Sequence, residues 1–158
     1  MSCDVVGFAV SLCLASTSVS AVPPGSAAVA APPPPSVASE PLFADIVRRA
    51  RLLRSQTKAY ENGALGAGAA QLAGFSGFQT EVSQLAALDM QGHVVLVKRG
   101  VSDDLKCILK GISQDLPVKL KALEAAPTAK ARHAALDDMF YLLRDNVQVI
   151  TAPPQPSA

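Results

Sequence analysis

Prolines divide this chain into parts that can and cannot form a packed core. Seven of the 12 prolines fall within residues 22–41, among Ala, Ser and Val, and they include the run Pro32–Pro35. This composition is typical of an extended polyproline-type linker, because it lacks backbone donors and has no aromatic ring to bury. Residues 151–158 hold three further prolines and are expected to form a disordered tail. A fold must therefore be built from residues 42–150, which contain only two prolines.

Residues 42–150 have the size of one small domain. They carry all 14 basic residues and 11 of the 13 acidic residues, so their net charge is 14 − 11 = +3, while the whole chain has a net charge of +1. This weak charge gives no reason to expect a strongly charged partner, and we predict that nucleic acid is not bound. The two tyrosines lie on or beside apolar stripes, so few aromatic rings remain to stack on bases.

Helical spacing of apolar residues runs through the domain. In the first segment, from Phe43 to the end signal Asn62-Gly63, the apolar or small positions recur every three or four residues and predict a helix. These positions are Phe43, Ile46, Ala50, Leu53, Thr57 and Tyr60. A Gly/Ala-rich segment predicts a second helix over about residues 65–90. Its glycines, Gly66, Gly68, Gly74 and Gly77, are expected to allow close approach of a neighbouring helix.

The rest of the domain continues this pattern. Residues 93–98 include three β-branched valines, as a strand would, but a single strand would have no partner, so we expect a continued or restarted helix. A third helix is expected after Ser102-Asp103-Asp104, with Pro117 breaking or kinking it or opening a fresh turn. Thr128 is expected to cap a last helix that ends near Ile150. The predicted fold is an all-α, antiparallel four-helix bundle.

The N-terminal segment resembles a secretory signal. Residues 5–21 are uncharged and apolar, and Val19-Ser20-Ala21 supplies the small residues that a signal peptidase requires. We predict cleavage after Ala21 and a periplasmic or secreted protein, although no basic residue precedes the apolar run. If residues 5–21 are not removed, they would anchor the chain to a membrane; a buried core helix is the third alternative. A polytopic membrane protein is excluded, because no other long uncharged apolar stretch exists.

The predicted cleavage after Ala21 determines which cysteines the mature chain retains. Cleavage would remove Cys3 and Cys13 and leave Cys107 as the only thiol of the mature chain, so no intramolecular disulfide would be possible. Leu105, Ile108 and Leu109 surround Cys107 in the sequence, and we predict that it is a buried packing residue.

Motifs for catalysis are missing from the sequence. There is no Gly-rich phosphate loop and no Gly-x-Ser-x-Gly elbow, and we predict no catalytic residue, no metal site and no cofactor. One weaker combination remains: Met90 and His93 are three residues apart, and with Cys107 they could serve copper or an axially ligated haem. A Cys107–His dyad with Asp103 or Asp104 is a further alternative, but a position in mid-helix favours an inert thiol.

A basic ridge is the remaining feature of the sequence. Its members, Arg48, Arg51, Arg54 and Lys58, lie on the first predicted helix. The ridge could meet an acidic partner surface or anionic headgroups; the alternative is a solvated face paired with acids such as Asp137-Asp138 or Asp103-Asp104.

The sequence therefore favours a non-enzymatic, exported helical bundle that binds a protein or another component of the cell envelope through helix surfaces. The alternative function is a small metal- or haem-binding redox carrier that uses Met90 and His93.

Overall fold

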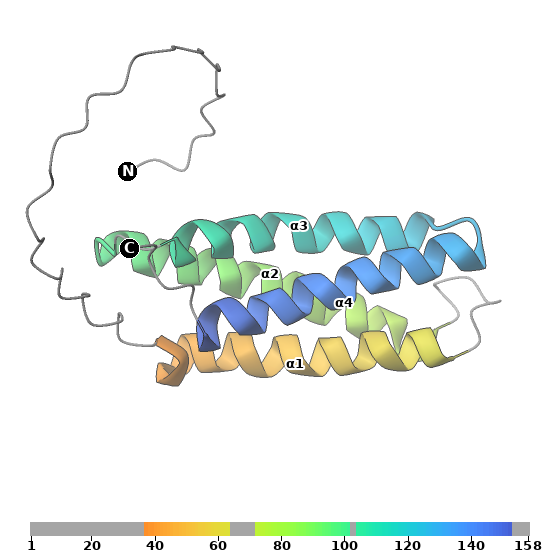
Figure 1. Cartoon of the computed structure of the whole chain (residues 1–158), viewed down its shortest axis with the longest axis horizontal. Coiled ribbons are helices and arrows are strands. Elements are labelled where there is room, and N and C mark those ends of the chain that lie inside the picture. Colours follow the sequence, from red (N-terminus) through yellow and green to blue (C-terminus); the bar gives the residue numbers. More distant parts are fainter. Residues whose placement is uncertain (1–36, 64–71, 102–103, 153–158) are drawn as a thin grey trace, which may run out of the picture.

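A computed structural model describes residues 37–63, 72–101 and 104–152 of the chain. Within these ranges it contains no strand and four long helices: α1 (Pro41–Asn62), α2 (Phe75–Lys98), α3 (Leu105–Ala125) and α4 (Ala129–Thr151), with a short 3-10 turn, η1 (Val37–Ser39), before them. Successive helices run in opposite directions and lie side by side (Figure 1). The all-α, four-helix prediction is confirmed for this part of the chain.

Each helix packs against its neighbours in sequence, and α1 closes the ring by packing against α4. The α2–α3 and α1–α4 contacts are the most extensive, and the α1–α2 contact is the least extensive of the four. The bundle is therefore made of two closely packed helix pairs. In this arrangement α2 and α4 face each other across the middle of the bundle.

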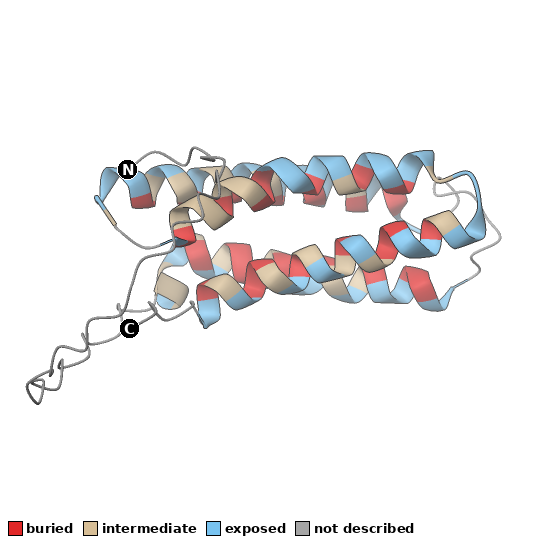
Figure 2. Cartoon of the chain, turned by 45° about the horizontal axis from the view of Figure 1, so that its top comes forward, coloured by how far each residue is buried: buried red, intermediate tan, exposed pale blue. Residues whose placement is uncertain are grey.

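Buried residues line the inner face of every helix (Figure 2). Large side chains from all four helices are fully buried, among them Phe43, Phe78, Leu109 and Met139. Burial of this apolar surface is the main force that holds the helices together. Among the described residues, no helix is long and apolar enough to cross a membrane.

Helix α1 follows the sequence prediction closely. All six residues of its expected stripe are buried, and the helix ends at Asn62. Pro41 is the first residue of the helix, where its missing N–H has no intrahelical partner to lose. Before it, Val37 and Ala38 pack against the core, so the folded part begins at least five residues before the predicted boundary. Arg99 Nη1 and Nη2 donate to Glu40 Oε1 and Oε2, at 2.8 and 2.7 Å, and tie this entry to the end of α2.

Helix α2 differs from the sequence prediction at its start. It begins at Phe75 and not near residue 65, because Gly74 has a left-handed backbone with φ of 70° and sits in the turn before the helix. Gly66 and Gly68 lie outside the described residues. Residues 93–98 are helical, as expected.

The expected use of the glycines is wrong for Gly77. A Cβ added there would meet no atom within 4 Å, because Gly77 is on the exposed side of α2. The close approach occurs instead at Gly92, where a Cβ would lie 3.2 Å from Leu109 Cδ1 and 3.3 Å from Phe43 Cε1. Gly92 therefore lets α1 and α3 pack tightly against α2.

Helix α3 runs through Pro117 without a break, so the predicted break or fresh turn at that residue is wrong. A proline inside a helix removes one backbone hydrogen bond and costs about 3 kcal/mol. Pro117 itself is exposed. The residues before and after it continue one buried stripe, made of Leu105, Leu109, Ile112, Leu116, Leu120 and Leu123. Burial of this stripe against the neighbouring helices offsets the local cost.

Helix α4 begins as predicted. Thr128 Oγ1 accepts a hydrogen bond from the backbone N–H of Ala131 at 3.1 Å, which caps the helix. Several other sequence predictions concern segments outside the described residues: the signal at residues 1–21, the linker as far as residue 36, the start of α3 at Ser102-Asp103, and the tail from residue 153.

Candidate interaction surface

The basic ridge lies along the side of α1 that faces α4. Arg48, Arg51 and Lys58 are exposed and Arg54 is half-buried. Two of the four pair with acids of their own helix: Arg48 with Asp45, and Lys58 with Glu61, where Lys58 Nζ lies 2.6 Å from Glu61 Oε2. The hydrogen bond that Lys58 donates to the Glu61 carboxylate raises the pKa of Lys58, so this side chain stays positively charged. Arg51 and Arg54 form no ion pair with an acid of the described residues.

Phe140 of α4 contacts the last two members of the basic ridge, Arg54 and Lys58. The guanidinium carbon of Arg54 lies 5.9 Å from the centre of the Phe140 ring, and Lys58 Nζ lies 5.8 Å from the same centre. Each such contact stabilises the cation by about 0.5–1 kcal/mol at an exposed site. Phe140 thus holds two cations from α1 side by side.

A second aromatic contact extends the surface along α4. Tyr141 is 51% exposed and meets Phe140 edge to face, with ring centres 5.8 Å apart. The guanidinium carbon of Arg144 lies 4.8 Å from the centre of the Tyr141 ring. Tyr141 thus lies beside the apolar stripe of α4, and its ring is exposed at the surface. Tyr60 is buried and donates its hydroxyl to the carbonyl of Ala73 at 2.9 Å.

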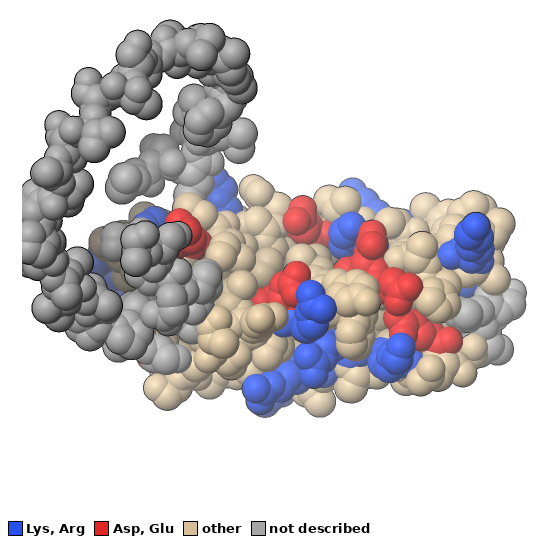
Figure 3. All heavy atoms as spheres, in the orientation of Figure 1, with Lys and Arg blue, Asp and Glu red and all other residues tan. Residues whose placement is uncertain are grey.

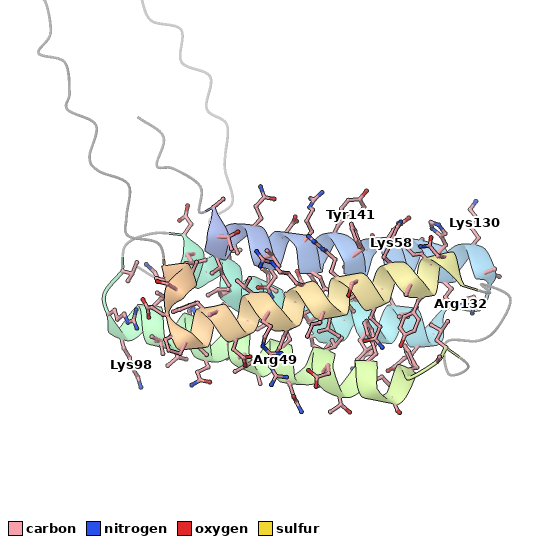
Figure 4. The ribbon with its side chains drawn as sticks, turned by 90° about the horizontal axis from the view of Figure 1, so that it is seen from below. Arg49, Lys58, Lys98, Lys130, Arg132 and Tyr141 are labelled. Atoms are coloured by element: carbon pink, nitrogen blue, oxygen red, sulfur yellow. The ribbon has the colours of Figure 1, made fainter. Side chains whose placement is uncertain are left out.

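We call this surface the α1/α4 face. It comprises Arg51, Arg54 and Lys58 of α1 and Phe140, Tyr141 and Arg144 of α4. Lys58 and Tyr141 project from neighbouring turns of the two helices (Figure 4). Basic side chains gather over these helices in the space-filling view, with acidic side chains between them (Figure 3). The surface is thus patterned with both signs of charge.

An open groove of about 510 Å³ adjoins the α1/α4 face, near the start of α1 and the end of α4. Its apolar lining includes Val47 and Leu52, and Leu52 is 58% exposed. Arg48 and Arg51 also line the groove. The groove therefore places a small apolar surface beside two positive charges.

Arg49 does not belong to this surface. It extends from the other side of α1 (Figure 4), where it bonds to Asp45 and reaches α2 through Glu81 and Gln84, at 2.7 and 2.9 Å. Likewise, the predicted pairing of the ridge with Asp137 and Asp138 is not formed as direct ion pairs. Asp137 lies against His133 and Asp138 against Lys119.

Met90 and His93, the weak ligand candidates, are both half-buried on α2. His93 Nδ1 lies 2.6 Å from the backbone carbonyl oxygen of Lys106. Since that oxygen can only accept, Nδ1 donates, and Nε2 is the nitrogen left to bind a ligand. No group of three or more His, Cys, Asp or Glu in the described ranges is arranged to hold a metal ion.

Cys107 differs from its sequence prediction. Its side chain is half-buried, and its sulfur is disulfide-bonded. The prediction that Cys107 is a buried packing residue is therefore wrong, because its side chain is only half-buried. Leu105 and Leu109 define the buried face of α3, and a residue midway between them points away from that face.

The sequence reasoning also missed a polar pair in the core. Asp89 of α2 and Asn146 of α4 are both fully buried, and Asn146 Nδ2 donates to Asp89 Oδ2 at 2.7 Å. A signal for it exists in the sequence, because Asp89 follows Leu85 by four residues and Asn146 follows Leu143 by three. Both polar residues therefore occupy positions on an otherwise apolar stripe.

Comparison of the chain with models of protein families, with curated proteins and with solved structures found no match.

Proposed function

We propose that this protein is a non-enzymatic, exported binding protein whose α1/α4 face docks on an acidic surface of a partner protein. The observation that carries the proposal is the combination of exposed arginine and aromatic side chains on two adjacent helices. Arginine and tyrosine are among the residues that most often dominate the energy of protein interfaces. Tyr141 and Arg51 offer such anchors at the surface of an otherwise well-packed bundle.

The chemistry of the face favours an acidic partner. Arg51 and Arg54 have no ion pair within the described residues, and a partner carboxylate can bind a guanidinium through two parallel hydrogen bonds. The groove beside them can accept an apolar side chain of the same partner against Val47 and Leu52. Charge then sets the orientation of the partner, and apolar burial contributes affinity.

Export is the second part of the proposal. Its support is the sequence of residues 5–21, which has the apolar run and the small residues of a secretory signal. The partner is accordingly expected in the cell envelope or the secreted fraction. Removal after Ala21 would give a periplasmic or secreted protein, whereas retention of the segment would hold the bundle at a membrane surface.

The test begins with the full chain immobilised on a support and exposed to the envelope and secreted fractions of the source cells. The captured protein is purified and titrated against the wild type, the double variant Arg51→Glu/Arg54→Glu, and the control Lys121→Glu, an exposed change on α3. If the face binds an acidic surface, the double variant raises the Kd roughly 30-fold or more, which corresponds to the loss of about 2 kcal/mol at an interface hot spot. The control changes it by less than about twofold.

Two results would overturn the proposal. One is an equal Kd for the double variant and the wild type. The other is binding of the wild type, but not of the double variant, to phosphatidylglycerol vesicles in the absence of any protein partner. That second result would assign the same face to an anionic membrane.

A metal- or haem-binding carrier is the second candidate. The observation that favours it is the contact of His93 Nδ1 with the Lys106 carbonyl, which fixes the ring and directs Nε2 away, as a carbonyl or carboxylate partner does for histidines that bind a metal. A visible absorption spectrum and elemental analysis of the purified protein test it, with His93→Ala as the comparison. Stoichiometric metal or a haem band that disappears in the variant would support this function over the first.

A further inference from the structure

Asp89 and Asn146 meet at the centre of the bundle, where α2 and α4 face each other. Each residue contributes one buried oxygen that has no hydrogen-bond partner, Asp89 Oδ1 and Asn146 Oδ1. The remaining contact, from Asn146 Nδ2 to Asp89 Oδ2, is 2.7 Å long. Buried polar atoms of native proteins rarely lack a partner, so these two oxygens require an explanation.

The hydrogen-bond donors and acceptors of Asp89 and Asn146 suggest an explanation for the two unpartnered oxygens. An ionised carboxylate can only accept hydrogen bonds, so it cannot satisfy the oxygen of Asn146. A protonated carboxyl group has one O–H donor, and a carboxylic acid and a primary amide can form a planar ring closed by two hydrogen bonds. A proton on Asp89 Oδ1 would satisfy both unpartnered oxygens at once.

We propose that Asp89 is held as a neutral carboxylic acid that donates its proton to Asn146 Oδ1, so that a two-bond ring joins the α2–α3 pair to the α1–α4 pair and opens when this one proton is lost. The ring is thus a proton-dependent contact between the two halves of the bundle. Buried polar contacts of this kind also fix the register of packed helices, because a slipped register leaves their polar atoms unpaired.

The surroundings of Asp89 agree with a neutral acid. Burial raises the pKa of Asp89 to about 8, and the hydrogen bond from Asn146 opposes that rise. No charged group contributes to the shift. Ionisable groups of the four helices have contacts of their own: Arg49 of α1 with Asp45 and Glu81, His93 of α2 with the Lys106 carbonyl, Lys106 of α3 with the Val101 carbonyl, and Arg144 of α4 with Asp145.

The sign of the pH effect follows from the two states. In the unfolded chain Asp89 titrates near its ordinary pKa of about 4, whereas in the folded bundle it titrates near 8. Between these values the folded state holds one more proton than the unfolded state, so rising pH favours unfolding. The unfolding constant is expected to rise up to tenfold per pH unit between about pH 4 and pH 8. Above pH 8 both states are ionised, this dependence levels off, and the ring is open in the folded bundle.

The test compares the full-length wild type with Asp89→Asn. The variant has nearly the same shape, and two amides can form the same two-bond ring without a proton that titrates. Urea unfolding of both proteins from pH 5 to pH 9 is expected to give a ratio of unfolding constants, wild type over variant, that rises roughly 500-fold between pH 5 and 8 and then levels off. The control Asp138→Asn, at an exposed residue paired with Lys119, should follow the wild type within about threefold. A ratio for Asp89→Asn that does not change with pH would overturn the proposal.

A second measurement needs no variant to fold. The carboxyl carbon of Asp89 in the wild type can be followed by NMR as pH is raised, and it is expected to titrate near pH 8, together with a change in the side-chain amide signals of Asn146. Titration near pH 4 would show that Asp89 is ionised in the folded protein and would overturn the proposal.

Discussion

Replacing Gly92 with alanine adds one methyl group where three core side chains crowd α2. The new Cβ would lie 3.2 Å from Leu109 Cδ1, 3.3 Å from Phe43 Cε1 and 3.5 Å from Ile46 Cδ1. The first two distances are shorter than the favourable carbon separation of about 3.5–4.0 Å. The side chains on α1 and α3 must therefore move outward, and the tight seams on both sides of α2 loosen.

Two opposing terms set the size of this effect. Alanine is about 1 kcal/mol better than glycine in a helix interior, but overpacking a close-packed core costs about 1–3 kcal/mol. We expect overpacking to dominate, with a net loss of about 1 kcal/mol in the free energy of unfolding and a fall in Tm of roughly 4–8 °C. Gly92 is buried, and its neighbours are the large side chains of a closed core.

The matched control is Gly111→Ala in α3, where an added Cβ meets no atom within 4 Å. That variant is expected to gain about 0.5–1 kcal/mol, since only the helix propensity changes. Urea unfolding of the full chain, followed by circular dichroism, measures both variants against the wild type. If Gly92→Ala stabilises the protein as much as Gly111→Ala does, the close approach at Gly92 is not the constraint we infer.

Three further outcomes are expected. Pro117→Ala should raise the free energy of unfolding by about 1–2 kcal/mol in a thermal melt, because it restores a helical hydrogen bond while the unfolded chain gains freedom; an unchanged or lower value would mean that the proline is needed for packing. Thr128→Ala should lower the free energy of unfolding by about 1 kcal/mol. Thr128→Ser keeps the capping oxygen and should lower the free energy of unfolding much less. Protein recovered from the envelope or secreted fraction should begin at Val22 by terminal sequencing and contain Cys107 as its one cysteine, and an intact Met1 on soluble protein inside the cell would contradict export.

The helical parts of the fold were predictable because burial imposes a period on the sequence. The stripe from Phe43 to Tyr60 gave α1 nearly to the residue, and Thr128 marked the start of α4 by the chemistry of its side chain. Predictions from neighbouring residues in the sequence were wrong where contacts between helices determine the local structure. Pro117 looks like a helix breaker on its own, yet α3 continues because apolar residues on both sides of it are buried together.

Only the α1 half of the α1/α4 face could be predicted from the sequence. The ridge on α1 follows from the spacing of Arg51, Arg54 and Lys58 along one helix. Its contacts with Phe140 depend on which helix lies beside α1, and that is a property of the tertiary structure. The same limit hid the Asp89–Asn146 pair, whose members are 57 residues apart in the sequence.

The even number of helices has a mechanical consequence. Four antiparallel helices bring η1 back beside the end of α4 (Figure 1), and these two elements are in contact. Tension applied through the two ends of the described bundle would therefore enter at a single pole and peel α1 and α4 apart one turn after another. It would not stretch the 22 residues of α1, about 33 Å of helix, along their axis. A bundle loaded in this way yields at low force, and it would yield first along the seam that carries the α1/α4 face.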